Sequence, residues 1–356
     1  MHRLTAGVSL LSLRARPLSV PLIEPFVIAT GRVDATRAVE VEVTVARHGQ
    51  NATGCGEAAC LPPVTDEDQG DILRALARPL GLEDLPSLGP VARAGVETAV
   101  LDAVARLDGV PLRVLLGGEL GAKTASLETD VTVAIASPAK MGELARAWAA
   151  RGFRHVKVKV GKDLDADVAA IEAIAGAAPD AQLRVDANAG YRAKDAIALV
   201  RACESRGFAV ECWEQPCAAE DLDGMAEVTA AARAPVVADE SVRRPSDLHA
   251  VIARRAAGGV NLKLAKLGGI EACLGVGRAA KRAGLKVMMG GMVETRLGMT
   301  AAAHVACALG GVDYVDLDTA WLLAEDPYDG GYVAEGARYE MPDTPGLGVT
   351  RKAPMR

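Results

Sequence analysis

The sequence predicts an α/β protein, a closed (β/α) barrel preceded by a smaller α+β domain. Its 356 residues exceed one ordinary compact core, and 50% of them are apolar, which is ample for a buried interior. After about residue 121, short valine-rich runs alternate with alanine-rich helical segments, a rhythm typical of a parallel sheet. Eight such runs favour a closed barrel over an open doubly wound sheet.

Residues 1–121 are expected to form the α+β domain. Strand patterns occur in VSLLSL, in PFVIAT, in AVEVEVTVARHGQ and again near Gly54–Ala58. Valine alternates with glutamate or threonine in the third of these, as in an antiparallel strand with one buried face. From about Asp66 to Leu116, alanine and leucine recur at three- and four-residue spacing, which predicts helices. The amino-terminal segment is interpreted as an opening strand rather than a targeting peptide, because arginines interrupt its apolar stretch.

Residues 122–325 are expected to form the barrel, and the tail 326–356, rich in glycine and proline, is expected to return to the first domain. Helical segments such as DADVAAIEAIAGAA and KDAIALVRACESRG separate the eight predicted strands. The strands are predicted in LETDVTVA, HVKVKVG, LRVDANAG, VECWEQP, VVADES, GVNLKLAK, KVMMGGMVE and YVDLDTA.

Composition excludes several classes of function. A net charge of −6 without a block of like charges argues against nucleic-acid binding. The sequence lacks a run of about 18 uncharged apolar residues, so we expect no membrane span. Seven scattered cysteines without CxxC pairs favour a reduced, cytoplasmic chain with buried thiols.

Polar residues interrupt the predicted barrel strands at their carboxyl ends, at intervals of 24 to 28 residues through the middle of the barrel. Each interval is about one strand–helix unit, so these side chains should surround one mouth of the barrel, where such folds carry their active sites. Solvent-exposed charges with unrelated roles would not recur at the same end of each successive strand. The residues are Lys159, Asp186, Glu214, Asp239, Lys263, the pair Gly290–Gly291, Asp316 and Asp318.

Three of these residues, Asp186, Glu214 and Asp239, are carboxylates on successive strands. Carboxylates that converge in this way repel one another unless a cation compensates them. All-oxygen ligation suits a hard ion, so the pattern predicts Mg²⁺. The alternative is that each carboxylate caps the helix that follows it.

Lysines flank the predicted metal ligands. Lys157 and Lys159 share one strand face because side chains alternate along a strand, and Lys263 lies one strand beyond the ligands. A desolvated neutral lysine is a base near neutral pH, and lysine with Mg²⁺ suits removal of a proton next to a carboxylate. For Lys157 a direct role in the site is expected, and a supporting or solvent-reaching role is the alternative. Lys266 is expected in a loop.

The motifs KVKVGKD, RVDANAGY, WEQP, VVADES and NLKLAKLGG together resemble those of the enolase superfamily, muconate-lactonizing-enzyme branch. The resemblance spans the whole chain and implies a (β/α)7β modified TIM barrel, with a capping domain formed by the amino-terminal region and the tail. It implies that Lys159 and Lys263 are paired acid/base catalysts. It further implies that Asn188 supports the ligands and that Lys157 tunes Lys159.

The closing VDLDTAWLL is similar to dipeptide epimerases of that superfamily. Asp316 and Asp318 face the barrel interior without a third lysine opposite, so they should receive a cation from the substrate; a structural salt bridge or helix cap is the alternative. The resemblance implies that they hold the α-ammonium group of a dipeptide. Backbone N–H groups around Gly291, Met292 and Val293 are expected to bind the substrate carboxylate.

The chain departs from epimerases that act on L-Ala-Glu, where a loop arginine meets the glutamyl side chain. Gly31 stands at that position, with Arg32 one residue away and Glu24 earlier in the loop. A small, hydrophobic or cationic second residue is therefore considered instead of glutamate. The predicted enzyme is a Mg²⁺-dependent isomerase, a homo-oligomer by family resemblance. The alternatives are o-succinylbenzoate synthesis, cycloisomerisation, acid-sugar dehydration and a non-catalytic binding barrel.

Overall fold

The computed structural model describes residues 3–29 and 31–353, and its main element is an eight-stranded sheet in the order β12-β11-β10-β9-β8-β7-β6-β5. Every neighbouring pair in it is parallel. The backbone N–H of Asp130 donates to the carbonyl of Val315 at 3.0 Å, which joins the two end strands. The strands are β5 (Val131–Val133), β6 (His155–Lys159), β7 (Gln182–Asp186), β8 (Val210–Glu214), β9 (Val236–Ala238), β10 (Gly259–Leu262), β11 (Lys286–Gly290) and β12 (Tyr314–Asp316).

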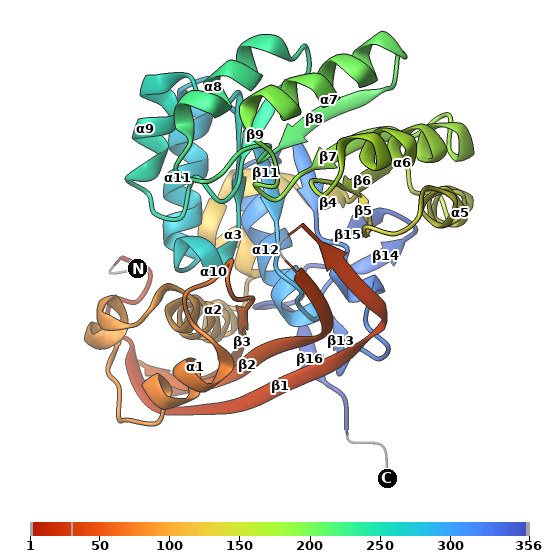
Figure 1. Ribbon diagram of the computed structural model, residues 1–356. Coiled ribbons are helices and arrows are strands. Elements are labelled where there is room, and N and C mark those ends of the chain that lie inside the picture. Colours follow the sequence, from red (N-terminus) through yellow and green to blue (C-terminus); the bar gives the residue numbers. More distant parts are fainter. Residues whose placement is uncertain (1–2, 30, 354–356) are drawn as a thin grey trace.

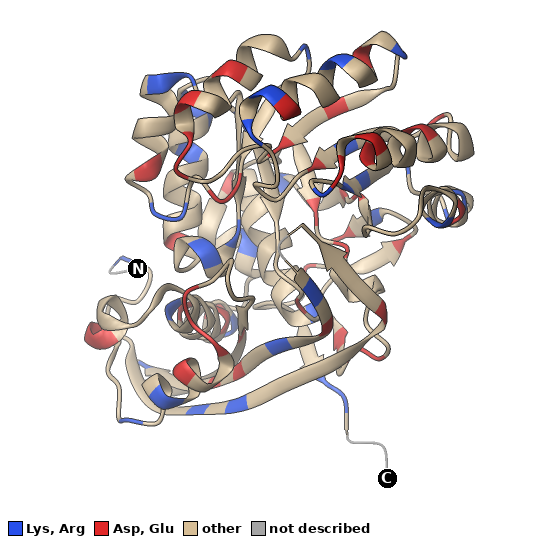
Figure 2. Cartoon of the chain, in the orientation of Figure 1, with Lys and Arg blue, Asp and Glu red and all other residues tan. Residues whose placement is uncertain are grey.

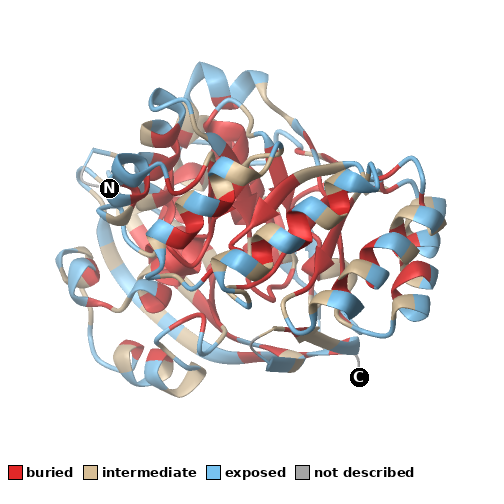
Figure 3. Ribbon diagram, turned by 45° about the horizontal axis from the view of Figure 1, so that its top comes forward, coloured by how far each residue is buried: buried red, intermediate tan, exposed pale blue. Residues whose placement is uncertain are grey.

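Helices connect these strands and cover the outside of the barrel (Figure 1). Their outer faces are exposed while the strands at the centre are buried (Figure 3). Side-chain caps at Ser137, Asp163, Asp221 and Thr295 begin four of them. The predicted (β/α)7β barrel is therefore confirmed. The helices are α5 (Pro138–Ala150), α6 (Leu164–Ala177), α7 (Ala193–Ser205), α8 (Leu222–Ala231), α9 (Asp247–Arg254), α11 (Ile270–Arg282) and α12 (Arg296–Ala308), with a short α10 (Leu264–Leu267) after β10.

The capping domain begins with an antiparallel sheet of β1 (Ser9–Ile28), β2 (Gly31–Arg47) and β3 (Gln50–Cys60). The prediction of two separate strands in VSLLSL and PFVIAT is wrong, because residues 9–13 and 25–28 both belong to β1, which pairs with β2 along its length apart from two irregularities. Residue 30, the last of the second run, lies outside the described residues. The predicted helical region contains α1 (Gln69–Leu76), a 3-10 turn η1 (Leu82–Ser87), α2 (Pro90–Leu107) and α3 (Leu112–Gly117), and is followed by α4 (Glu119–Lys123).

Helix α2 packs directly on β3, and glycine makes this close approach possible. A Cβ atom at Gly54 would lie 2.2 Å from the carbonyl oxygen of Ala99, and one at Gly56 would lie 2.2 Å from that of Gly95. Any larger residue at either position would push the helix off the sheet.

The tail contacts both parts of the chain. It contains β13 (Tyr328–Gly330), β14 (Val333–Glu335), β15 (Arg338–Glu340) and β16 (Val349–Arg351). The predicted strand LETDVTVA is divided, because β4 (Ser126–Glu128) pairs with β15 while β5 enters the barrel. Toward the capping domain, Arg351 pairs with Glu40 and the N–H of Leu112 donates to the carbonyl of Gly346 at 2.8 Å. The divisions near residues 121 and 325 stay predictions.

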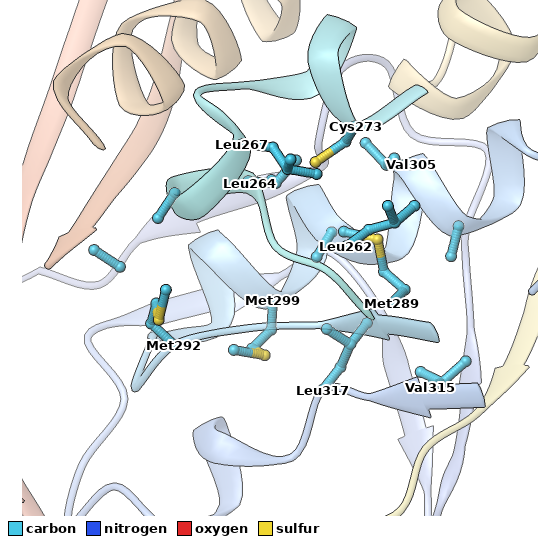
Figure 4. Packing of buried hydrophobic residues seen from close by; sticks show 14 of the residues in the cluster. Leu262, Leu264, Leu267, Cys273, Met289, Met292, Met299, Val305, Val315 and Leu317 are labelled. Carbon is cyan, nitrogen blue, oxygen red and sulfur yellow. The ribbon is translucent and has the colours of Figure 1, made fainter. Parts of the chain in front are cut away.

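Apolar side chains fill the space between the barrel strands and the helices. In Figure 4, Leu262 of β10 and Met289 of β11 lie beneath Cys273 of α11 and Val305 of α12, and Val315 of β12 belongs to the same cluster. All seven cysteines are free. Charges of both signs are interspersed over the outer helices in Figure 2. Within the described residues, no helix combines the length and apolar character needed to cross a membrane.

Candidate active site

The ends of β6, β7 and β8 bring the first predicted site residues together. Lys157 and Lys159 both point into the barrel and are 1% and 6% exposed, so the two lysines of one strand face serve the interior rather than the solvent. Lys159 Nζ donates to Asp186 Oδ2 at 2.6 Å and to Asn188 Oδ1 at 3.2 Å. Asp186 ends β7, and its register partner Glu214 ends β8.

Lys157 lies deeper in the barrel and links two groups of carboxylates. Its Nζ atom is 3.0 Å from Asp186 Oδ2, 2.8 Å from Glu214 Oε2 and 2.6 Å from Asp316 Oδ2. Asp186 and Glu214 are predicted metal ligands, whereas Asp316 belongs to the predicted ammonium site. This bridging position could not be inferred from the spacing of the two lysines.

The other predicted lysine stands across the mouth of the barrel. Asp239 follows β9 directly, Lys263 follows β10 directly, and Lys263 Nζ donates to Asp239 Oδ2 at 2.7 Å. The expectation that Lys266 lies in a loop is wrong. It belongs to α10, is 4% exposed, and its Nζ donates to Asp239 Oδ1 at 2.5 Å and to the carbonyl of Asn261 at 2.9 Å. The short helix after β10 turns this side chain back into the site.

Charge pairing dominates the electrostatics of these groups. Burial opposes ionisation of Asp186, but the ammonium groups of Lys157 and Lys159 lower its pKa to about 2. Burial also opposes ionisation of Asp239, yet Lys263 and Lys266 hold its pKa below the usual range. Burial alone would lower the pKa of Lys263, but Asp239 raises it above its ordinary value. Desolvation therefore does not make Lys263 neutral in this arrangement, because its carboxylate partner outweighs it.

The predicted metal ligands provide a donor set that fits Mg²⁺. Asp186, Glu214 and Asp239 are 0%, 1% and 0% exposed, and all of them present carboxylate oxygens at neighbouring strand ends. Burial followed by the charge of Asp186 raises the pKa of Glu214, which is the response of a carboxylate held close to other anions. Lysines pair with these carboxylates in the structure, and a hard divalent cation is the other partner that such buried oxygens accept.

A second acidic group lies at the junction of β5 and β12. Asp130, Asp316 and Asp318 each offer an oxygen atom within 4.8 Å of the others. Asp318 Oδ2 accepts from the N–H of Thr132 at 2.5 Å, and Asp130 Oδ2 accepts from Arg184 Nη1 at 2.9 Å. Within the described residues, the Oδ1 atoms of Asp130 and Asp318 are buried without a hydrogen-bond partner. The group is therefore short of positive charge.

Sequence reasoning missed Asp130 and Arg184. Asp130 stands two residues before the buried Thr132, and Arg184 stands two residues before Asp186. Each pair shares a strand face, so the period-two rule could have placed both residues in the barrel interior beneath the site. Arg184 also donates to Glu211 Oε1 at 2.5 Å, which continues the ion-pair network away from the mouth.

The loop after β11 reaches the site as predicted from the glycine pair. Gly291, Met292 and Val293 line the cavity, but the N–H of Met292 already donates to Glu294 Oε1 at 2.8 Å. The hydroxyl of Thr36 in the capping domain donates to the carbonyl of Val293 at 2.6 Å. The loop therefore connects the capping domain to the barrel mouth.

One cavity brings together the predicted lysines, the aspartate pair and the loop after β11, whereas Asp186, Glu214 and Asp239 do not line it. Its walls contain the predicted catalytic lysines and the paired aspartates, and the capping domain adds apolar side chains. The lining residues are Phe26, Ile28, Leu61, Val64, Thr132, Lys157, Lys159, Asn188, Glu240, Lys263, Gly291, Met292, Val293, Asp316, Asp318 and Thr319.

The residues that replace the expected loop arginine lie away from this cavity. Gly31 is exposed with open space around it, and Arg32 Nε donates to Asp34 Oδ1 at 3.0 Å on the surface. Glu24 Oε1 is 3.9 Å from Lys140 Nζ, also on the surface. Among the residues that the structure describes, the capping-domain contribution to the cavity therefore comes from Phe26, Ile28 and two other apolar residues rather than from a charge.

Comparison with known proteins assigns the chain to a family. Residues 140–354 match the model of the family described as enolase C-terminal domain-like. The chain therefore belongs to this family, and the resemblance seen in the motifs is confirmed.

Similar proteins are epimerases. The chain is 38% identical to an L-Ala-D/L-amino acid epimerase from Populus trichocarpa, over 93% of this chain and 82% of the relative. It is 37% identical to an aromatic dipeptide epimerase from Herpetosiphon aurantiacus, over 95% and 98%. The structure of a dipeptide epimerase from Enterococcus faecalis V583, complexed with Mg and L-Leu-L-Tyr, superposes with a TM-score of 0.87 at 29% identity, covering 96% and 100%. The prediction that this chain is an isomerase is confirmed.

Proposed function

We propose that this chain is a Mg²⁺-dependent dipeptide epimerase that inverts the α-carbon of the carboxyl-terminal residue. The observation that carries the proposal is the placement of two lysines on opposite sides of one carboxylate cluster. Lys159 pairs with Asp186 at 2.6 Å from β6, and Lys263 pairs with Asp239 at 2.7 Å from the end of β10. A substrate held between them would present one face of its α-carbon to each amine.

The proposed proton transfer uses each lysine once. One amine removes the α-proton, so that a C–H bond breaks and an N–H bond forms, and the electron pair becomes part of an enediolate. The opposite ammonium then returns a proton to the other face, which restores the C–H bond with inverted configuration. Lys157 and Asn188 would orient Lys159. Lys157 contacts Asp186, the carboxylate that also accepts from Lys159, and Asn188 accepts from the Lys159 amine directly.

Asp186, Glu214 and Asp239 would hold Mg²⁺, because they supply three buried carboxylates from adjacent strand ends. When bound, Mg²⁺ supplies positive charge that neutralises these carboxylates and stabilises the enediolate. A neutralised Asp239 no longer raises the pKa of Lys263, which favours the free amine that proton abstraction requires. The N–H groups of Gly291 and Val293 would hold the substrate carboxylate.

The aspartate pair favours a dipeptide over the other substrates of the superfamily. Asp316 and Asp318 line the cavity, and Asp318 Oδ1 is buried without a partner within the described residues. A substrate α-ammonium group would meet this requirement. The acids used in o-succinylbenzoate synthesis, cycloisomerisation or acid-sugar dehydration carry no such group, so these reactions are the weaker alternative.

The second residue of the dipeptide is proposed to be hydrophobic. Phe26, Ile28, Leu61 and Val64 line the cavity from the capping domain. Glutamate would need a cation, and the described residues of this wall offer none. A cationic residue would need Glu24, which lies beside Lys140 instead. The aromatic dipeptide epimerase among the relatives supports the same preference. A homo-oligomeric state and a cytoplasmic location remain predictions.

A screen of L-Xaa-L-Xaa dipeptides in D₂O tests the proposal by mass spectrometry. We expect Mg²⁺-dependent deuterium incorporation at the α-carbon of the second residue, with hydrophobic second residues ahead of glutamate. Muconate, acid sugars and the o-succinylbenzoate precursor serve as competing substrates. Turnover of one of these acids without exchange in any dipeptide would refute the proposal, and absence of any reaction would favour a binding barrel.

A further inference from the structure

Gln215, which follows Glu214 at the end of β8, is fully buried and uses all of its side-chain hydrogen-bonding capacity. Its Oε1 atom accepts from the N–H groups of Asp239 at 2.8 Å and Ser241 at 3.1 Å. Its Nε2 atom donates to Ser241 Oγ at 2.8 Å and to the carbonyl of Cys217 at 2.9 Å. An amide group is the side chain that supplies two acceptor sites and two donors at one position.

These bonds continue the sheet beyond the end of β9. The strand covers only Val236–Ala238, so its regular hydrogen bonding stops immediately before Asp239. The amide of Gln215 then takes the place of a strand partner for Asp239 and Ser241. These hydrogen bonds fix the backbone of Asp239 relative to the end of β8, where Glu214 lies.

The backbone of Gln215 extends the connection to β7. Its carbonyl accepts from the N–H of Ala189 at 2.8 Å, and its own N–H donates to the carbonyl of Val237 at 2.9 Å. Gln215 has a φ of +35°, a value that L residues rarely adopt, and it precedes a proline, which normally favours an extended conformation. Such a conformation is strained and persists only where the surrounding structure enforces it.

The segment held by Gln215 also reaches both lysines. Asp239 Oδ2 accepts from Lys263 Nζ at 2.7 Å. On the other side, Glu240 Oε1 accepts from Asn188 Nδ2 at 3.3 Å, and Asn188 Oδ1 accepts from Lys159 Nζ at 3.2 Å. Residues 239 and 240 therefore contact Lys263 directly and Lys159 through one intermediate side chain.

We infer that Gln215 is the positioning residue that sets the spacing of the three carboxylates and, through them, of the two lysines. Gln215 is not among the residues that line the cavity. It would therefore affect the site only by positioning Asp239, Glu240 and the strand ends. The inference rests on the proposed function insofar as it assigns Mg²⁺ to Asp186, Glu214 and Asp239.

The test compares Gln215→Leu with the unchanged enzyme in two measurements that need no turnover: Mg²⁺ affinity by calorimetry and the thermal unfolding midpoint. Loss of a residue that orients metal ligands typically weakens metal affinity by about 10- to 100-fold, and we expect a loss of this size. Gln69→Leu is the matched control. Gln69 also donates through Nε2 to backbone carbonyls, those of Ala38 at 2.6 Å and Leu18 at 3.2 Å, but within the capping domain. It should lower the unfolding midpoint and leave Mg²⁺ affinity unchanged.

Ser241→Ala provides a milder variant if Gln215→Leu does not fold. It removes one partner of the Gln215 amide and keeps both bonds to Oε1, so we expect a smaller loss of Mg²⁺ affinity in the same direction. The inference is wrong if either position 215 or position 241 changes only the unfolding midpoint, as Gln69→Leu should. If the unchanged protein binds Mg²⁺ but epimerises no dipeptide, the proposed function fails while the comparison of affinities still decides the role of Gln215.

Discussion

Replacing Asp318 with asparagine removes a negative charge from the wall of the cavity and keeps the shape of the side chain. Asp318 is fully buried, and its Oδ2 atom accepts from the N–H of Thr132 at 2.5 Å. Its other oxygen has no partner within the described residues, so it is available to a substrate ammonium group. The substitution therefore tests whether this end of the cavity selects for a free α-amine.

The expected loss follows from the charge separation. Opposite unit charges about 4 Å apart attract by about 4 kcal/mol at an effective dielectric constant near 20. Because about 1.4 kcal/mol corresponds to a tenfold change, Asp318→Asn should reduce kcat/KM for a dipeptide by about a thousandfold.

The pH dependence provides a second, independent readout. Burial, followed by the charge of Asp316, raises the pKa of Asp318 to about 6, although Thr132 and Lys157 act in the opposite direction. As the pH falls through 6, Asp318 takes up a proton and its attraction for the ammonium group is lost. Above about 8 the substrate α-amine loses its own proton. The wild-type kcat/KM should therefore be highest between these values, and Asp318→Asn should lack the acid limb attributed to Asp318.

The assay is epimerisation of a hydrophobic dipeptide followed by circular dichroism from pH 5 to 9. Asp313→Asn is the control, because Asp313 immediately precedes β12 but is exposed and pairs with Lys286 at 2.7 Å. It should leave kcat/KM and its pH profile unchanged. A loss of less than tenfold in Asp318→Asn, with the acid limb retained, would refute the assignment of the ammonium site.

Three further predictions concern the lysines, the apolar wall and the stability of the fold. Lys159→Ala and Lys263→Ala should each abolish epimerisation, measured by polarimetry, and near-normal turnover in either would contradict the two-base mechanism. Phe26→Arg should favour dipeptides with glutamate as the second residue over those with a hydrophobic one. In paired substrate assays, the ratio of the two kcat/KM values should rise by about tenfold, or about 1.4 kcal/mol. An unchanged ratio would mean that Phe26 does not contact the second residue of the substrate. Burial lowers the pKa of His304 from 6.5 to about 3. Below pH 6.5 the unfolded chain therefore binds a proton that the native chain excludes, and the free energy of unfolding falls as the pH falls. Urea unfolding should show about 2 kcal/mol less stability at pH 5 than at pH 8 from this group, and the same pH difference in His304→Gln would rule His304 out as its source.

The sequence was informative about the barrel because its signals are local and periodic. Each strand is a short valine-rich run, and each ionisable residue at its carboxyl end recurs after one strand–helix unit. Parallel strands with one helix between them place equivalent positions at the same rim, so the convergence of Lys159, Asp186, Glu214, Asp239 and Lys263 follows from spacing alone.

Positions that depend on contacts between distant segments were misread or missed. Lys266 was expected in a loop, but the short helix α10 returns it to Asp239. The valine and glutamate alternation of β2 suggested a solvated glutamate face, yet Glu40 is 3% exposed because it pairs with Arg351 of the tail. Neither contact leaves a periodic trace in the local sequence.

Sequence by itself determined which residue types stand at the mouth of the barrel and in what order, because strand periodicity and chain connectivity suffice for that. Only the tertiary structure decided how they are paired: Lys157 between two carboxylate groups, Gln215 beneath Asp239, and an apolar wall from Phe26 and Ile28 above the site. The physical reason is that pairing depends on distances of a few ångströms between strand ends, and those distances arise only when the sheet closes and the capping domain packs onto it.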